Sequence, residues 1–113
     1  MKIRYVYNDS RTPVATIATE LNKTNDILEV ALARCHSNMD IFVKKRGRHI
    51  AASRLKKRDA ECEFSRDFPS TSLKCLFEGH VIECRRDDFY LLKNQIEILV
   101  LDKSKRIQML KKG

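Results

Sequence analysis

A dense cluster of cations lies in the middle of this chain. The segment from Lys44 to Arg58 reads KKRGRHIAASRLKKR and holds eight Lys or Arg residues, with no Asp or Glu. Residues 1–58 contain 13 Lys or Arg against 5 Asp or Glu, whereas residues 59–113 contain 10 of each. The whole net charge of +8 therefore belongs to the first half. Clustered cations bind phosphates and release condensed counterions, so this segment predicts a nucleic-acid partner. A solvated basic loop beside a core is the alternative.

The expected phosphate contacts fall into two groups. The larger group is the basic segment itself, namely Lys44, Lys45, Arg46, Arg48, His49, Arg54, Lys56, Lys57 and Arg58. The smaller group is Lys23, Thr24 and Asn25, at the N-terminus of a predicted helix whose free amides attract a phosphate.

Metal and catalytic chemistry have weaker signals. Cys62, Cys75, His80 and Cys84 have a spacing of C-x12-C-x4-H-x3-C, and zinc favours such ligands. The close CxxC pairs of structural zinc sites are missing, so whether these four residues bind a metal stays open and we expect no cofactor. None of the nucleotide-binding, zinc-protease or nucleophile-elbow motifs occurs. The sequence therefore predicts a protein that is not an enzyme.

The first half predicts a strand followed by two helices. KIRYVY at residues 2–7 is rich in β-forming residues, and residues 8–11 form a turn. Thr12 and Pro13 are typical of a helix start, and apolar residues then recur at helical spacing as far as residue 21. Thr24 begins the second predicted helix, which continues to Asn38.

The remainder predicts short strands. Ile41–Val43 and Ile50–Ala52 flank a glycine-containing tip, which indicates a hairpin, with a helix over residues 49–62 as the competing interpretation. Residues 63–72 are the expected connector. Five further strands are expected, at residues 73–77, 80–84, 89–92, 96–101 and 106–110.

Two segments of the first half carry a family resemblance. PVATIATELNKTNDILEVALARC, followed by FVKKRGRHI, resembles the winged helix-turn-helix DNA-binding superfamily over residues 12–53. The resemblance implies a recognition helix from Asn25 and a wing over Lys44–His49 that tracks duplex DNA. The outer face of that helix carries no Lys or Arg, so the wing is the expected phosphate contact.

A weaker resemblance covers the second half. Residues 72–110 are similar to small Sm-like or SH3-like barrels, which implies single-stranded RNA as a ligand and Phe89 with Tyr90 as stacking residues. The predicted strand Ile96–Leu101 would pair across a dimer axis.

These observations combine into one expected architecture. We expect an α+β fold with a winged-helix-like basic module at residues 1–62. A β-rich module for dimerisation or partner docking would follow at residues 63–113. The longest apolar run is too short to cross a membrane and no signal peptide is recognisable, so a cytoplasmic location is expected.

The expected function is regulation of transcription through duplex DNA, favoured over RNA. The alternative is a small phage or mobile-element type protein that docks on a nucleic-acid enzyme, with Ile27 and Val30 as apolar anchors. RNA binding by an Sm-like barrel is the third interpretation.

Overall fold

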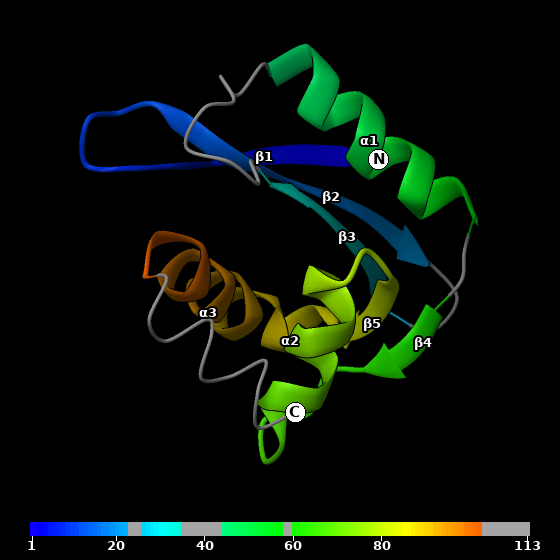
Figure 1. Ribbon diagram of the computed structural model, residues 1–113. Helices are drawn as coiled ribbons and strands as arrows, with labels where there is room; N and C mark the ends of the chain where they lie inside the picture. Colours follow the sequence, from blue (N-terminus) through cyan, green and yellow to red (C-terminus); the bar gives the residue numbers. More distant parts are fainter. Residues whose placement is uncertain (23–25, 35–43, 58–59, 103–113) are drawn as a thin grey trace.

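The computed structural model describes residues 1–22, 26–34, 44–57 and 60–102. Within these residues, five strands form one mixed sheet in the order β1-β2-β3-β5-β4. Helix α1 lies on one face of the sheet, and α2 and α3 lie on the other, so the described residues form three layers (Figure 1). Helices together with a mixed sheet are consistent with the expected α+β class.

Strands and helices alternate irregularly along the described residues. They are β1 (Lys2–Tyr7), β2 (Pro13–Asn22), β3 (Ile27–Arg34), α1 (Lys44–Lys57), β4 (Ala60–Glu63), α2 (Pro69–Phe77), β5 (Val81–Arg85), the 3-10 turn η1 (Arg86–Asp88) and α3 (Phe89–Leu101). Strands β1, β2, β3 and β5 pair antiparallel, and β4 pairs parallel to β5. Because β5 pairs with β3, strands from both expected modules share one sheet.

Both helices expected between residues 12 and 38 are wrong where the structure describes them. Residues 13–22 form β2 and residues 27–34 form β3, with the two strands paired from Ala15–Arg34 to Asn22–Ile27. The strands are central and covered on both faces, so Ala15 to Thr19 are all buried. A strand buried on both faces reads as a continuous apolar run, in which a helical spacing can arise by chance.

The expected hairpin of residues 41–52 is also wrong from Lys44 onward, since these residues begin α1. The competing helix over 49–62 is confirmed as far as Lys57. Gly47, Ala51 and Leu55 are buried at a spacing of four residues, which marks the face of α1 toward the sheet. With strands in place of helices and a helix in place of the wing, the winged-helix arrangement is not confirmed.

The second half is more helical than expected. Residues 73–77 lie in α2, which starts at Pro69 in its first turn, where a missing N–H is tolerated. Residues 89–92 and 96–101, expected as two strands, both belong to α3. Residues 96–101 are helical, so the expected dimer contact through an edge strand at Ile96–Leu101 is wrong. The strand expected at 106–110 lies outside the described residues. The strand expected at 80–84 is confirmed as β5.

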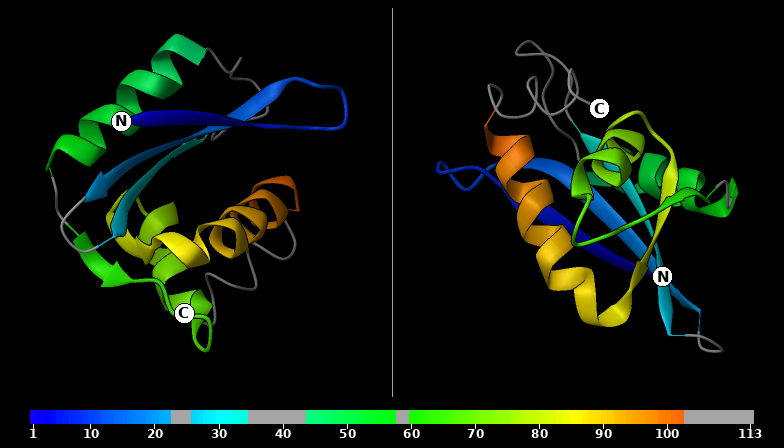
Figure 2. Two further views of the ribbon diagram at one scale, coloured as in Figure 1. Left: turned by 180° about the vertical axis from the view of Figure 1, so that it is seen from behind. Right: turned by 90° about the horizontal axis from the view of Figure 1, so that it is seen from below.

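The two faces of the sheet carry different cores. Small side chains line the α1 face, where Ala18, Ala31 and Ala33 pack with Ala51 and Leu55 of the helix. The opposite face carries larger residues from β2, β3, α2 and α3, including Ile17, Leu32, Leu76, Leu92 and Ile96. Figure 2 shows α2 and α3 lying across this second face. The alanines let α1 pack closely against the sheet. The side chains on the opposite side of α1 point away from the sheet.

Candidate nucleic-acid interface

The outer side of α1 carries a dense group of cations. The helix sequence KKRGRHIAASRLKK contains seven Lys or Arg and no Asp or Glu. Its exposed basic residues are Lys44, Lys45, Arg46, Arg48, His49, Lys56 and Lys57. Because the buried stripe of Gly47, Ala51 and Leu55 faces the sheet, these side chains are free to meet a partner. The basic residues expected to bind phosphate are thus largely brought together, on a helix and not on a wing.

The charge at the start of this helix opposes the helix dipole. Lys44, Lys45 and Arg46 lie in the first turn, where the backbone already presents partial positive charge. Arg48 also lies four residues after Lys44 and three residues after Lys45, so like charges are neighbours on the helix surface. Helix α1 itself offers no carboxylate to offset this repulsion. A bound phosphate would relieve it.

A shallow cavity lies on the outer side of α1. Its volume is about 560 Å³, and it is lined by Met1, Lys45, Arg46, Arg48, His49 and Ala52. Four of these six residues are Lys, Arg or His, and none of the six is acidic. The cavity can therefore accept an anionic group at the junction of α1 with the start of β1.

Two tyrosines on β1 extend this surface beyond the helix. The Lys44 Nζ lies 4.8 Å from the Tyr5 ring centroid and 5.3 Å from the Tyr7 ring centroid. The two rings meet edge to face with their centroids 6.5 Å apart. Sequence analysis missed both tyrosines. The signal was present, since alternation along KIRYVY places Tyr5 and Tyr7 on one face of β1 and Lys2 and Arg4 on the other.

Arg54 differs from the other cations of the helix. Its guanidinium Nη1 donates a hydrogen bond to the Leu32 carbonyl, in a part of β3 beyond the last β3–β5 pair at Val30. Burial lowers the pKa of the Arg54 guanidinium. Its guanidinium also lies against Gly79, a residue with a φ of +99° in the turn after α2. Arg54 is therefore turned inward and holds α1 against β3. The sequence had placed it among the phosphate contacts instead.

Several other predicted residues lie elsewhere. Lys23, Thr24, Asn25 and Arg58 are outside the described residues. Of the two expected partner-binding anchors, Val30 is fully buried and only Ile27 is partly exposed, so they do not form an exposed apolar pair. Phe89 is buried in the core, whereas Tyr90 is exposed.

No metal site or membrane span emerges from the described parts of the chain. Among them, no group of three or more His, Cys, Asp or Glu residues is placed to hold a metal ion, and the set Cys62, Cys75, His80 and Cys84 does not form one. None of the described helices has the length and apolar character needed to cross a bilayer.

Comparison with known proteins adds no relative. No protein-family model, curated protein or solved structure gives a significant match to this chain.

Proposed function

We propose that this protein binds nucleic acid through the outer face of α1, with duplex DNA as the favoured form. The observation that carries the proposal is a surface helix with seven Lys or Arg, no acid, and a cation-lined cavity at its side. A soluble surface usually intersperses both signs of charge. A helix that exposes six Lys or Arg and no acid has the electrostatic footprint of a phosphate-binding surface.

The dimensions of the helix suit a duplex. From Lys45 to Lys57 the axis rises about 18 Å at 1.5 Å per residue. A duplex carries one phosphate for about every 1.7 Å of its axis, so several phosphates lie within reach of such a helix. A projecting helix face also fits the major groove, where Arg46 and Arg48 have the side-chain chemistry to contact guanine edges.

A regulatory role in transcription stays part of the proposal, because a protein bound across phosphates excludes or recruits other proteins on the same DNA. A homodimer also stays a prediction, since two-fold pairing commonly accompanies duplex binding. We do not propose docking through Ile27 and Val30, because the burial of Val30 removes half of that anchor.

Fluorescence anisotropy with a labelled 20-base-pair duplex tests the proposal. If six side chains of α1 contact phosphates, the logarithm of the binding constant should fall with the logarithm of salt concentration with a slope of about −5. Charge reversal in the double variant Arg46→Glu/Arg48→Glu should weaken binding at least tenfold. It should also reduce the slope by about 2, because two phosphate contacts are lost.

The matched control is Arg11→Glu/Arg85→Glu, which makes the same change in net charge at two exposed residues away from α1. We expect this control to lose much less affinity than the α1 variant. Absence of duplex binding at 50 mM salt would contradict the proposal, as would equal losses in the two double variants. Tighter binding to single-stranded RNA of equal length would contradict the preference for duplex DNA.

A further inference from the structure

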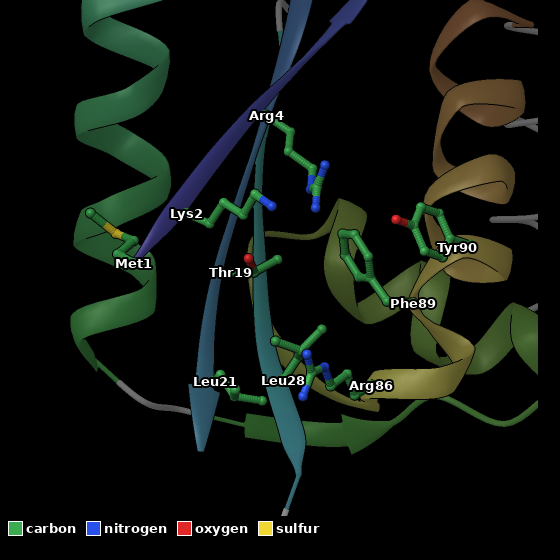
Figure 3. A pocket seen from close by; sticks show the side chains of 9 residues that line it. All are labelled: Met1, Lys2, Arg4, Thr19, Leu21, Leu28, Arg86, Phe89 and Tyr90. Atoms are coloured by element: carbon green, nitrogen blue, oxygen red, sulfur yellow. The ribbon is translucent and has the colours of Figure 1, made fainter. Parts of the chain in front are cut away.

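A second cavity lies on the opposite face of the sheet from α1. Its volume is about 430 Å³, within the usual range for small-molecule sites. It lies between the start of β1, the end of β2, the start of β3 and the beginning of α3 (Figure 3). Its lining residues are Met1, Lys2, Arg4, Thr19, Leu21, Leu28, Arg86, Phe89 and Tyr90.

Three cations line this cavity. Lys2 and Arg4 reach in from β1, and Arg86 reaches in beside Leu28 from the turn before α3 (Figure 3). None of the described lining residues is acidic. The Arg4 guanidinium lies over the Phe89 ring, 5.2 Å from its centroid, so its position is fixed by stacking. The Arg4 Nε is buried and has no hydrogen-bond partner among the described residues. A buried donor without a partner is costly, and a small shift of the guanidinium toward an anionic oxygen in the cavity would satisfy it.

Arg86 is available to the same ligand. Its ion pair with Asp26 is long, at 3.5 Å, and both side chains are more than 60% exposed. Exposed pairs of this kind contribute little stability, so the Arg86 guanidinium can turn to a bound anion at small cost. The backbone N–H of Arg86 donates to the Asp26 carbonyl at 3.2 Å, which holds the residue at the cavity edge.

The remaining lining is apolar and aromatic. Leu21 and Leu28 come from the paired ends of β2 and β3. Tyr90 is 69% exposed, and the centroid of its ring lies 6.2 Å from that of the Phe89 ring. An exposed aromatic ring beside a cavity offers a stacking surface that accepts any base. The cavity therefore combines cations for an anion with a flat apolar surface for a ring.

We propose that this cavity binds a nucleotide. Its 5′-phosphate would contact Arg4, Arg86 and Lys2, and its base would lie against Tyr90 and the leucines. The proposal does not depend on DNA binding by α1. The nucleotide can be free, or it can be the 5′-phosphorylated end of a strand. Met1 lines both cavities, so a strand end held by α1 could reach this site around the edge of β1.

Isothermal titration with adenosine 5′-monophosphate tests the site, with adenosine and inorganic phosphate as the two half-ligands. We expect saturable binding of the nucleotide that is at least tenfold tighter than binding of either half-ligand. Arg86→Gln and Arg4→Gln should each weaken it about tenfold, because each removes a charged contact to the phosphate. Tyr90→Ser should weaken it about fivefold, because the stacking surface is lost.

Arg85→Gln is the matched control, since Arg85 is the exposed neighbour of Arg86 and does not line the cavity. It should bind the nucleotide as the wild type does. Arg86 and Tyr90 are both exposed, so their variants should keep the wild-type thermal transition. No nucleotide binding at millimolar concentration would overturn the proposal, as would equal losses in Arg86→Gln and Arg85→Gln. Inorganic phosphate binding as tightly as the nucleotide would overturn the assignment of a base subsite.

Competition separates the two sources of the nucleotide. Two ten-nucleotide strands are compared as competitors, one with a 5′-phosphate and one with a 5′-hydroxyl. If only the 5′-phosphorylated strand displaces the nucleotide, the natural ligand is a strand end. Displacement by neither strand identifies the free nucleotide. The competition is measured with the Arg46→Glu/Arg48→Glu variant. In this variant α1 binds strands weakly, so displacement reports on the cavity alone.

Discussion

At the scale of single residues, burial decides which polar groups remain available for a partner. Arg48 and Arg54 belong to the same helix, yet Arg48 is exposed and Arg54 donates inward to a backbone carbonyl. Cys84 shows the same rule for a thiol. It is fully buried, and its Sγ lies 3.3 Å from the Arg85 carbonyl as a hydrogen-bond donor. Residue type alone did not distinguish these roles.

Cys84 should remain a neutral thiol well into the alkaline range. Burial raises the pKa of the Cys84 thiol to about 12, and the carboxylates of Asp88 and Glu63 contribute to this increase. Iodoacetamide reacts with the thiolate, so at pH 9 the folded protein should be alkylated at the partly exposed Cys62 and remain unmodified at Cys84. Peptide mapping by mass spectrometry measures both sites, and unfolding in urea should make them react alike. Equal modification in the folded protein would contradict the buried assignment.

The same pKa has a consequence for stability. The pKa of Cys84 is raised on folding, so above the ordinary value of 9.0 the unfolded chain loses this proton while the folded chain keeps it. The contribution of Cys84 to the free energy of unfolding is therefore complete below pH 9 and declines as the pH rises toward 12. A Cys84→Ala variant should show a shallower decline than the wild type above pH 9, whatever its stability at neutral pH.

At the scale of elements, the sequence indicated β1 and β5 correctly and misassigned the central strands. KIRYVY is at the edge of the sheet and carries the β-forming residues that identify a strand. β2 and β3 are covered on both faces, so no alternation marked them, and Val14, Ile17, Ala18 and Leu21 matched a helical spacing by chance. Only the tertiary arrangement shows that both faces are buried.

The helices were missed for different reasons. In α3, the buried residues Phe89, Leu92, Ile96 and Leu99 have helical spacing, but the polar residues 93–95 between them were interpreted as a turn. In α1, the buried stripe contains Gly47 and Ala51, which carry almost no hydrophobic signal. The basic site was predicted nonetheless, because the charge of the segment does not depend on whether it is a strand or a helix. Its aromatic extension on β1 and the second cavity depend on the sheet and were not predicted.

Arg54 links two of these elements and should therefore matter for stability and little for DNA. Replacing it in Arg54→Met keeps much of the side-chain bulk and leaves the Leu32 carbonyl without its donor. We expect the free energy of unfolding to fall by about 1–3 kcal/mol, the usual cost of a buried polar group without a partner. Urea denaturation measures this change. Under conditions where the variant is folded, its duplex affinity should remain within about twofold of the wild type.

The comparison variant for Arg54 is Arg48→Met on the outer face of the same helix. It should show the reverse pattern, with little loss of stability and a clear loss of duplex affinity. If Arg54→Met weakened DNA binding as much as Arg48→Met does, the inward role of Arg54 would be wrong.

At the scale of the whole molecule, the charge is distributed for binding at the expense of stability. The net charge of +8 belongs to the first half of the chain, and much of it lies on one helix. The proposed nucleotide site adds further cations on the other face of β1. Self-repulsion in such a distribution destabilises the folded state, and a polyanionic partner removes it. Stability and affinity should therefore respond in opposite directions to a charge change at the start of α1.

Lys45→Glu tests this opposition. A carboxylate in the first turn interacts favourably with the helix dipole, which contributes about 0.3–1 kcal/mol. It also replaces repulsion of Arg48 with attraction at a favourable spacing, which contributes about 0.2–0.5 kcal/mol. We expect a higher free energy of unfolding in urea together with weaker duplex binding. Lys56→Glu, in the last turn, is the matched control, since there the same charge change opposes the dipole and should lower both quantities. If Lys45→Glu left duplex affinity unchanged, the cationic face of α1 would not be the binding surface.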